Sequence, residues 1–167
     1  MLPEKKVLGE LEYELMLLAR HALRPHRGDA VLDRSAMVLL SRLESVPPMT
    51  LKELACALRL DGSTVHRQTA ALLRAGLLAY APRDGGEVAR RVAPTEAGRA
   101  ALAGSREIYE QGLEGVVRHW PEERRRQLVD ILQAFNQEVE GLEGGPWPRS
   151  QTGRRAGVRV DGAGPLH

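Results

Sequence analysis

The sequence contains very little cysteine and no long hydrophobic run. Its one cysteine, Cys56, excludes an internal disulfide and a cysteine-based zinc cluster, and its apolar neighbours in LACALRL predict a small buried side chain rather than a redox switch. No apolar run approaches the roughly 18 residues that a membrane-spanning helix requires, and no secretory signal pattern is present. These absences predict a soluble, cytoplasmic protein that does not contact a membrane.

The motifs that mark common enzyme sites are also missing. The sequence contains no GxSxG nucleophile motif, no phosphate-binding P-loop, no GxGxxG and no metal-binding motif. Its glycine-rich places are DGG at residues 84–86, which is typical of a hairpin turn, and the stretch that follows Gly141. We therefore expect neither an enzyme nor a cofactor or metal.

Lysine is scarce, and the basic charge is concentrated in one part of the chain. Arginine outnumbers lysine 21 to 3, and the formal net charge is only +2. Residues 49–95 nevertheless contain 7 basic and 4 acidic side chains, whereas residues 96–140 contain 6 and 9. Because binding to a polyanion depends on the local field and not on the total charge, this distribution indicates that the central segment faces an anionic partner.

Residues 61–78, DGSTVHRQTAALLRAGLL, predict an amphipathic helix whose polar side is unusual. At 100° per residue, its apolar arc contains Val65, Thr69, Leu72 and Leu73. The opposite side contains Ser63, Arg67, Ala70 and Arg74. That side carries a hydroxyl and two guanidinium groups but no acidic residue, which favours an anionic partner over a merely solvated surface.

The residues on either side predict further helices and a hairpin. Leucines recur at steps of three and four residues through residues 4–24, up to Pro25. Asp33 is a plausible N-cap for a helix over 33–45, and Thr50 and Glu53 have the spacing of a capping box at the start of a third helix. Residues 77–95 predict a hairpin, in which Pro82 and Pro94 restrict the strands to short edge pieces.

The C-terminal half predicts two more helices and a tail. Thr95 is expected to cap a helix that runs to about Trp120, and Pro121 suits the first turn of the next helix. The apolar positions that this last helix is expected to bury are Leu128, Ile131, Leu132, Phe135 and Val139. Residues 143–167 are rich in Gly, Pro and Arg and have almost no periodicity, so we expect them to be disordered.

The long terminal helices have larger apolar stripes than a small central module needs, which predicts a partner chain. We divide residues 1–142 into a DNA-binding lobe at 33–95 and dimerisation helices at 4–24 and 96–140. The expected fold is mainly α with a small β-hairpin. A short helix, a tight turn, a polar-faced helix and a basic hairpin together form a winged helix-turn-helix, flanked here by the long helices.

Three stretches of the sequence resemble the multiple-antibiotic-resistance regulator (MarR) family of bacterial transcription factors. They are LDRSAMVLLSRLE, TLKELACALRLDGSTVHRQTAALLRAGLL and PTEAG. The resemblance covers residues 5–140 approximately and stops at the tail. It implies a homodimer held by intertwined terminal helices and two winged lobes on a palindromic site in double-stranded DNA. Such regulators often have a small-molecule pocket between the dimerisation helices and the lobe.

The resemblance also implies which residues contact DNA. Ser63, Thr64, His66 and Arg67 match the start of the family's groove-contacting helix. Arg74 lies near the end of the same helix. Two interpretations of its side chain stay open there, a DNA contact and an ordinary solvated surface residue. The family usually has an arginine in the wing seven residues before the threonine that aligns with Thr95, and this sequence has Val88 there. The candidates to replace that arginine are Arg83, Arg90 and Arg91.

We therefore predict a sequence-specific transcriptional regulator, a homodimeric repressor whose affinity for its operator responds to a small ligand. The mechanism would be a change in the separation of the two groove-contacting helices, which must span one DNA turn, about 34–36 Å, to engage both half-sites. The competing hypothesis is a winged-helix module for protein–protein interaction that has no operator.

Overall fold

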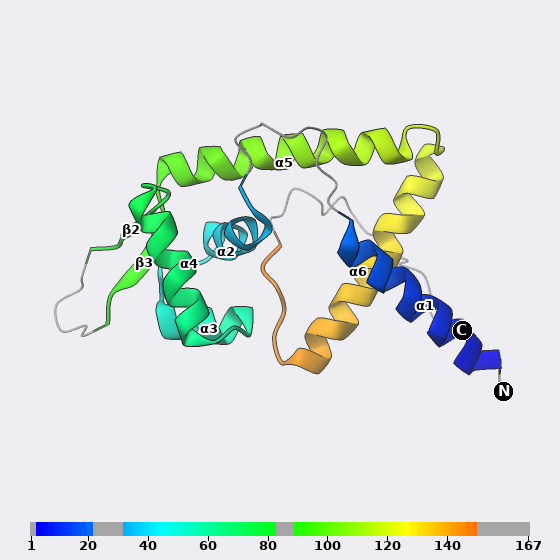
Figure 1. Cartoon of the computed structure of the whole chain (residues 1–167), viewed down its shortest axis with the longest axis horizontal. Coiled ribbons are helices and arrows are strands. Elements are labelled where there is room, and N and C mark those ends of the chain that lie inside the picture. Colours follow the sequence, from blue (N-terminus) through cyan, green and yellow to red (C-terminus); the bar gives the residue numbers. More distant parts are fainter. Residues whose placement is uncertain (1–2, 22–31, 83–88, 150–167) are drawn as a thin grey trace, which may run out of the picture.

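The computed structural model describes residues 3–21, 32–82 and 89–149 of the chain. Its elements in chain order are α1 (Pro3–Arg20), α2 (Arg34–Glu44), β1 (Met49–Thr50), α3 (Leu51–Leu58), α4 (Gly62–Arg74), β2 (Leu78–Tyr80), β3 (Arg91–Pro94), α5 (Glu96–Val117) and α6 (Glu122–Glu143). The lobe formed by α2 to β3 lies at one end of α5, and α6 folds back from the other end (Figure 1). The structure confirms the expected fold class, mainly helical with a small antiparallel sheet.

The buried core lies in the lobe and at the start of α5. Its apolar side chains come from every helix and from two strands of the lobe: Leu39, Leu40, Leu43, Leu54, Val65, Leu72, Leu78, Val92 and Leu102. Burial of each such side chain stabilises the fold by about 1.5–3 kcal/mol relative to leaving it in water. Helix α6 buries none of its side chains. The lobe therefore has a core of its own, whereas α6 has none within one chain.

Three polar side chains cap the helices as the sequence predicts. Asp33 Oδ1 accepts a hydrogen bond from the Ala36 amide at 2.8 Å. Thr50 and Glu53 form the full capping box of α3, and Thr95 Oγ1 accepts from the amide of Gly98. Each cap satisfies backbone donors that have no partner inside the helix.

The turn after α4 depends on Gly76, which has a φ of 70°. This left-handed conformation is open to glycine without steric cost. It lets the Leu77 amide donate to the Leu72 carbonyl at 2.9 Å, which satisfies a carbonyl at the end of the helix. The chain can then enter β2 directly. Gly76 thus stops this helix.

The sheet differs from the prediction of two edge strands. Its order is β1-β3-β2, with all pairs antiparallel. Strand β3 is therefore central, because Met49 pairs with Val92 on the side away from β2. Pro94 occupies the end of β3, opposite Leu78. The sequence did not reveal β1, since two residues are too few to show an alternating pattern.

The predictions about α1 and α3 have different outcomes. Helix α1 ends at Arg20, and residues 22–24 of the predicted helix lie outside the described residues. The burial predicted for Cys56 on α3 is wrong, because Cys56 is exposed. It follows the buried Leu54 by two positions, which turns it about 200° around the helix to the outer face.

The tail is also more ordered than the sequence predicts. Residues 144–149 have defined contacts: the Trp147 amide donates to Glu140 at 3.1 Å, and Arg149 forms an ion pair with the same carboxylate. These contacts are possible because Gly144, with a φ of 90°, ends α6 and reverses the chain. Composition alone does not reveal such specific pairs. Residues 150–167 lie outside the described residues.

Candidate nucleic-acid interface

Helix α4 has one side in the core and the other in solvent. Val65, Thr69 and Leu72 are buried, which fixes the rotation of the helix on the lobe. The side chains that face solvent include four of the candidate DNA contacts, Ser63, His66, Arg67 and Arg74. The fifth candidate on this helix, Thr64, is half-buried. The predicted amphipathic pattern is confirmed. The rotation of α4 places its polar side chains together on one solvent-exposed face.

The exposed face of α4 carries positive charge without local neutralisation. The helix contains no acidic residue between Gly62 and Arg74. Among the residues that the structure describes, none forms an ion pair with Arg67. An exposed guanidinium of this kind has five N–H donors available to an anion or to the edge of a base.

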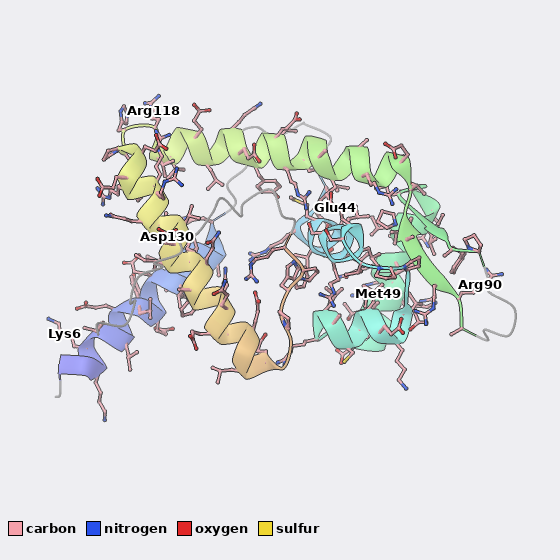
Figure 2. All side chains as sticks on the ribbon, turned by 180° about the vertical axis from the view of Figure 1, so that it is seen from behind. Lys6, Glu44, Met49, Arg90, Arg118 and Asp130 are labelled. Carbon is pink, nitrogen blue, oxygen red and sulfur yellow. The ribbon has the colours of Figure 1, made fainter. Side chains whose placement is uncertain are left out.

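The hairpin places Arg90 beside the sheet at the far end of the molecule. Its guanidinium lies over the Tyr80 ring, 4.6 Å from the ring centre. Figure 2 shows Arg90 at the outer end of the lobe, away from α6. The aromatic face orients the side chain and leaves its charge exposed. Arg83 and Val88, at the tip of the predicted hairpin, lie outside the described residues.

Arg91 has a different environment, although it is the next residue. Its Nη1 donates to Glu53 Oε2 at 2.8 Å and to the Pro48 carbonyl at 3.1 Å. The Thr50 amide, and then Arg91, lower the pKa of the Glu53 carboxyl below its ordinary value. Arg91 therefore connects β3 to the start of α3, and its charge is partly offset by a carboxylate.

Two contributions to this surface were missed by sequence reasoning. Tyr80, which supports Arg90, was assigned only to a strand, and Glu53 only to a helix cap. The β2–β3 register pairs Tyr80 with Val92, so Arg90 is the diagonal neighbour of Tyr80 across the strands. The signal that could reveal the contact between Tyr80 and Arg90 is this β2–β3 register. The sequence of the hairpin turn does not fix the register by itself. The partner of Arg91 depends on β1, which no local pattern reveals.

Comparisons with known proteins agree with this geometry. The MarR family model matches residues 32–82, from the start of α2 through the first strand of the hairpin. The HTH-type transcriptional regulator YxaD of Bacillus subtilis is 30% identical over 132 residues, which cover 75% of this chain and 90% of YxaD. The chain belongs to the MarR family.

Solved structures show that the MarR fold extends beyond the lobe. A MarR family protein from Bacillus stearothermophilus has a TM-score of 0.66 and 21% identity, over 83% of this chain and 99% of that protein. The apo form of MarR from E. coli has a TM-score of 0.59 and 14% identity, over 81% and 98%. The helices that flank the lobe are thus part of the shared architecture.

Membership of the MarR family makes this chain a DNA-binding transcriptional regulator. The family consists of regulators and not of enzymes. In the described part of the chain, no helix combines the length and apolar character needed to cross a membrane. The sequence-predicted DNA contacts that the structure describes lie on the exposed face of α4 and on the hairpin beside it.

Proposed function

We propose that this protein is a homodimeric repressor that binds a palindromic operator, with α4 in the major groove and the wing against the flanking backbone. The observation that carries this proposal is the acid-free, solvent-exposed face of α4, whose opposite side is buried in the lobe. A rigidly held helix with an exposed guanidinium in its second turn suits the reading of base edges. Ser63, Thr64, His66 and Arg67 are the proposed groove contacts.

The wing contacts are divided by environment. Arg90 is proposed to contact phosphate, since its charge is exposed and its side chain is oriented by Tyr80. Arg91 adds to the positive electrostatic potential of the wing. Its hydrogen bonds to Glu53 and to the Pro48 carbonyl, however, favour a role in holding the wing on α3. Arg74 is a further phosphate contact at the end of α4, and Arg83 remains a candidate from the hairpin tip.

Exposed apolar faces on the flanking helices support the homodimer. Leu8 on α1 is 63% exposed and Ile131 on α6 is 66% exposed. Other large apolar side chains exposed on these two helices are Val7, Leu11, Tyr13, Met16, Leu18, Leu128, Val129, Leu132, Phe135 and Leu142. An apolar surface of this extent marks an interface in a soluble protein. A second copy of the chain would cover it with the matching surface.

A cavity supports the proposed response to a small ligand. It has a volume of about 400 Å³ and lies between α2, α5, α6 and residues 147–149. A ligand there would touch both the lobe and the helices that carry it. Binding that favours one lobe position over another would change the separation of the two α4 helices, and hence the affinity for an operator of fixed spacing.

The proposal is tested by selecting bound sequences from a random duplex pool and measuring the affinity of the selected site across a salt series. We expect a palindromic consensus and an affinity that falls steeply as salt rises, because each neutralised phosphate releases counterions. A scrambled duplex of equal length is the control. Failure to retain any duplex at low salt would favour the alternative, a module for protein–protein interaction.

Repression is tested separately by transcription in vitro. The selected operator is placed over the start site of a test promoter, and transcript yield is measured with and without the protein. We expect the yield to fall only when the operator is intact. An increase in transcript would assign the protein to activation.

A further inference from the structure

The six residues after α6 return to the DNA-binding lobe. The amides of Gly144 and Gly145 both donate to the Glu140 carbonyl, at 3.0 and 3.2 Å, which ends the helix in a tight turn. The chain then runs back from the end of α6 towards α2 (Figure 1, orange). There the guanidinium of Arg42, on α2, lies 5.5 Å from the centre of the Trp147 ring. Arg42 and Trp147 are both half-buried.

Polar contacts hold this segment on α6 and join the end of α6 to the lobe. Glu140 accepts from the Trp147 amide at 3.1 Å and from both terminal nitrogens of Arg149. The Arg149 bonds, and then the Trp147 amide, lower the pKa of the Glu140 carboxyl. One turn later, Glu143 forms an ion pair at 3.6 Å with Arg59, which follows α3 in the lobe. The end of α6 is thus connected to two helices of the lobe.

Among the described residues, few other contacts hold α6 in place relative to the lobe. Helix α6 buries no side chain, so apolar packing does not fix its position. Helix α5, by contrast, is fixed on α2, because Arg106 donates twice to Glu44 and once to Ser41. The lobe with α5, α6 and residues 144–149 form a closed triangle (Figure 1). The cavity of about 400 Å³ lies inside it, lined by Ser41, Arg106, Gln133 and Trp147 among others.

We propose that residues 144–149 form a strap that fixes the lobe relative to α6, with Trp147 and Arg149 as positioning residues for operator spacing. With the strap in place, the lobe with α5, the helix α6 and the strap hold one another at fixed angles. Without the strap, α5 and α6 are joined only at the turn between them, so the angle between them can open and close. In the proposed dimer, α6 belongs to the interface and the lobe carries α4. The strap then sets the separation of the two α4 helices. This inference rests on the proposed function, but the strap itself can be tested without DNA.

The first experiment measures how tightly the lobe is held against α6. Spin labels are placed on Cys56, exposed on α3, and on Asp130→Cys, exposed on α6. Labelled chains are mixed with excess unlabelled protein, so that each measured distance lies within one chain. We expect one narrow distance distribution, and at least a twofold wider one after Trp147→Ala. Equal widths would overturn the strap.

Two further variants separate the strap from a general loss of folding. Arg149→Ala keeps the Trp147 ring but removes the pair with Glu140, and it should widen the distribution in the same direction. Glu138→Ala is the matched control, because that side chain is exposed on the same helix and forms no ion pair with any residue that the structure describes. Removal of residues 150–167 should leave the distribution narrow. A truncation after residue 143 should widen it.

The second experiment measures operator spacing. Duplexes carry the selected half-sites with one or two base pairs added or removed between them. The normal chain should prefer the selected spacing at least tenfold, and Trp147→Ala should reduce that preference to about threefold. A wider distance distribution with an unchanged spacing preference would overturn the positioning role. If the normal chain binds no duplex, the proposed function fails, and the distance widths still decide whether the strap exists.

Discussion

Arg67 and Arg91 carry the same charge in very different surroundings. Arg67 lies in the second turn of α4 and is exposed, without an ion pair to any residue that the structure describes. Arg91 is half-buried and donates to Glu53 and to the Pro48 carbonyl. A guanidinium that is already bonded to a carboxylate contributes less to a new anionic partner. The two arginines should therefore respond differently to substitution.

Replacing Arg67 with Ala should weaken operator binding by about 1–3 kcal/mol and relax discrimination at one base pair in each half-site, since its fork can pair with guanine O6 and N7. The measurement is affinity for the operator and for a scrambled duplex across a salt series. Arg118→Ala is the charge-matched control, because Arg118 lies at the opposite end of α5 from the lobe (Figure 2). Equal weakening on both duplexes would mean that Arg67 provides only electrostatic attraction.

Arg90→Ala should behave differently from Arg67→Ala. A phosphate contact carries charge but little sequence information, so affinity should fall on both duplexes alike. The slope of log affinity against log salt should also become shallower by about one unit per lobe. A loss confined to the operator would instead assign Arg90 to base recognition.

The Glu53 carboxyl should make the stability of the lobe depend on pH. Bonds from the Thr50 amide and from Arg91 hold its pKa below the ordinary value of 4.5. A lowered pKa in the folded state adds stability that is present above the unfolded pKa and is lost as pH falls through the folded one. The free energy of unfolding in urea should therefore differ most between the normal chain and Glu53→Gln near pH 7. The difference should shrink below about pH 4.5, and a constant difference would contradict this assignment.

At the scale of the elements, the start of α5 packs closely against the backbone of Leu77, the residue before β2. A Cβ added at Gly98 would lie 2.0 Å from the Leu77 carbonyl oxygen, which is backbone and cannot swing away. Gly98→Ala should therefore lower the free energy of unfolding by roughly 1–3 kcal/mol. Gly104→Ala is the control in the same helix, since nothing lies within 4 Å of its added Cβ. That change should be neutral or stabilising by up to about 1 kcal/mol. Urea unfolding of both variants tests the contrast.

How far the elements follow from the sequence depends on the range of the contacts that define them. The caps at Asp33, Thr50 and Thr95 involve residues three apart, so the sequence reveals them. The polar face of α4 is equally predictable, because helical periodicity determines which side of the helix is buried and which is exposed. Strand β1 and the partner of Arg91 depend on residues about forty positions away, and no local pattern contains that information.

At the scale of the whole molecule, the exposed face of α6 predicts obligate dimerisation. Leu132→Asp places a charge in the apolar stripe and should prevent assembly, at a cost of several kcal/mol. Gln137→Asp makes a similar change on the other side of the same helix and should leave the dimer intact. Light scattering at micromolar concentration measures the mass of both. A stable monomer of the unsubstituted chain would contradict the dimer.

The position of β3 between β1 and β2 has a consequence for the order in which the lobe folds. Helices α3 and α4 are neighbours in the chain, whereas Met49 pairs with Val92 across both helices and the hairpin. Closing the longer loop costs more conformational entropy, so local contacts tend to form first. The two helices should therefore associate early, and β3 should be joined to β1 only in a later step of folding. A newly made chain would then acquire the face of α4 before the wing is fixed beside it.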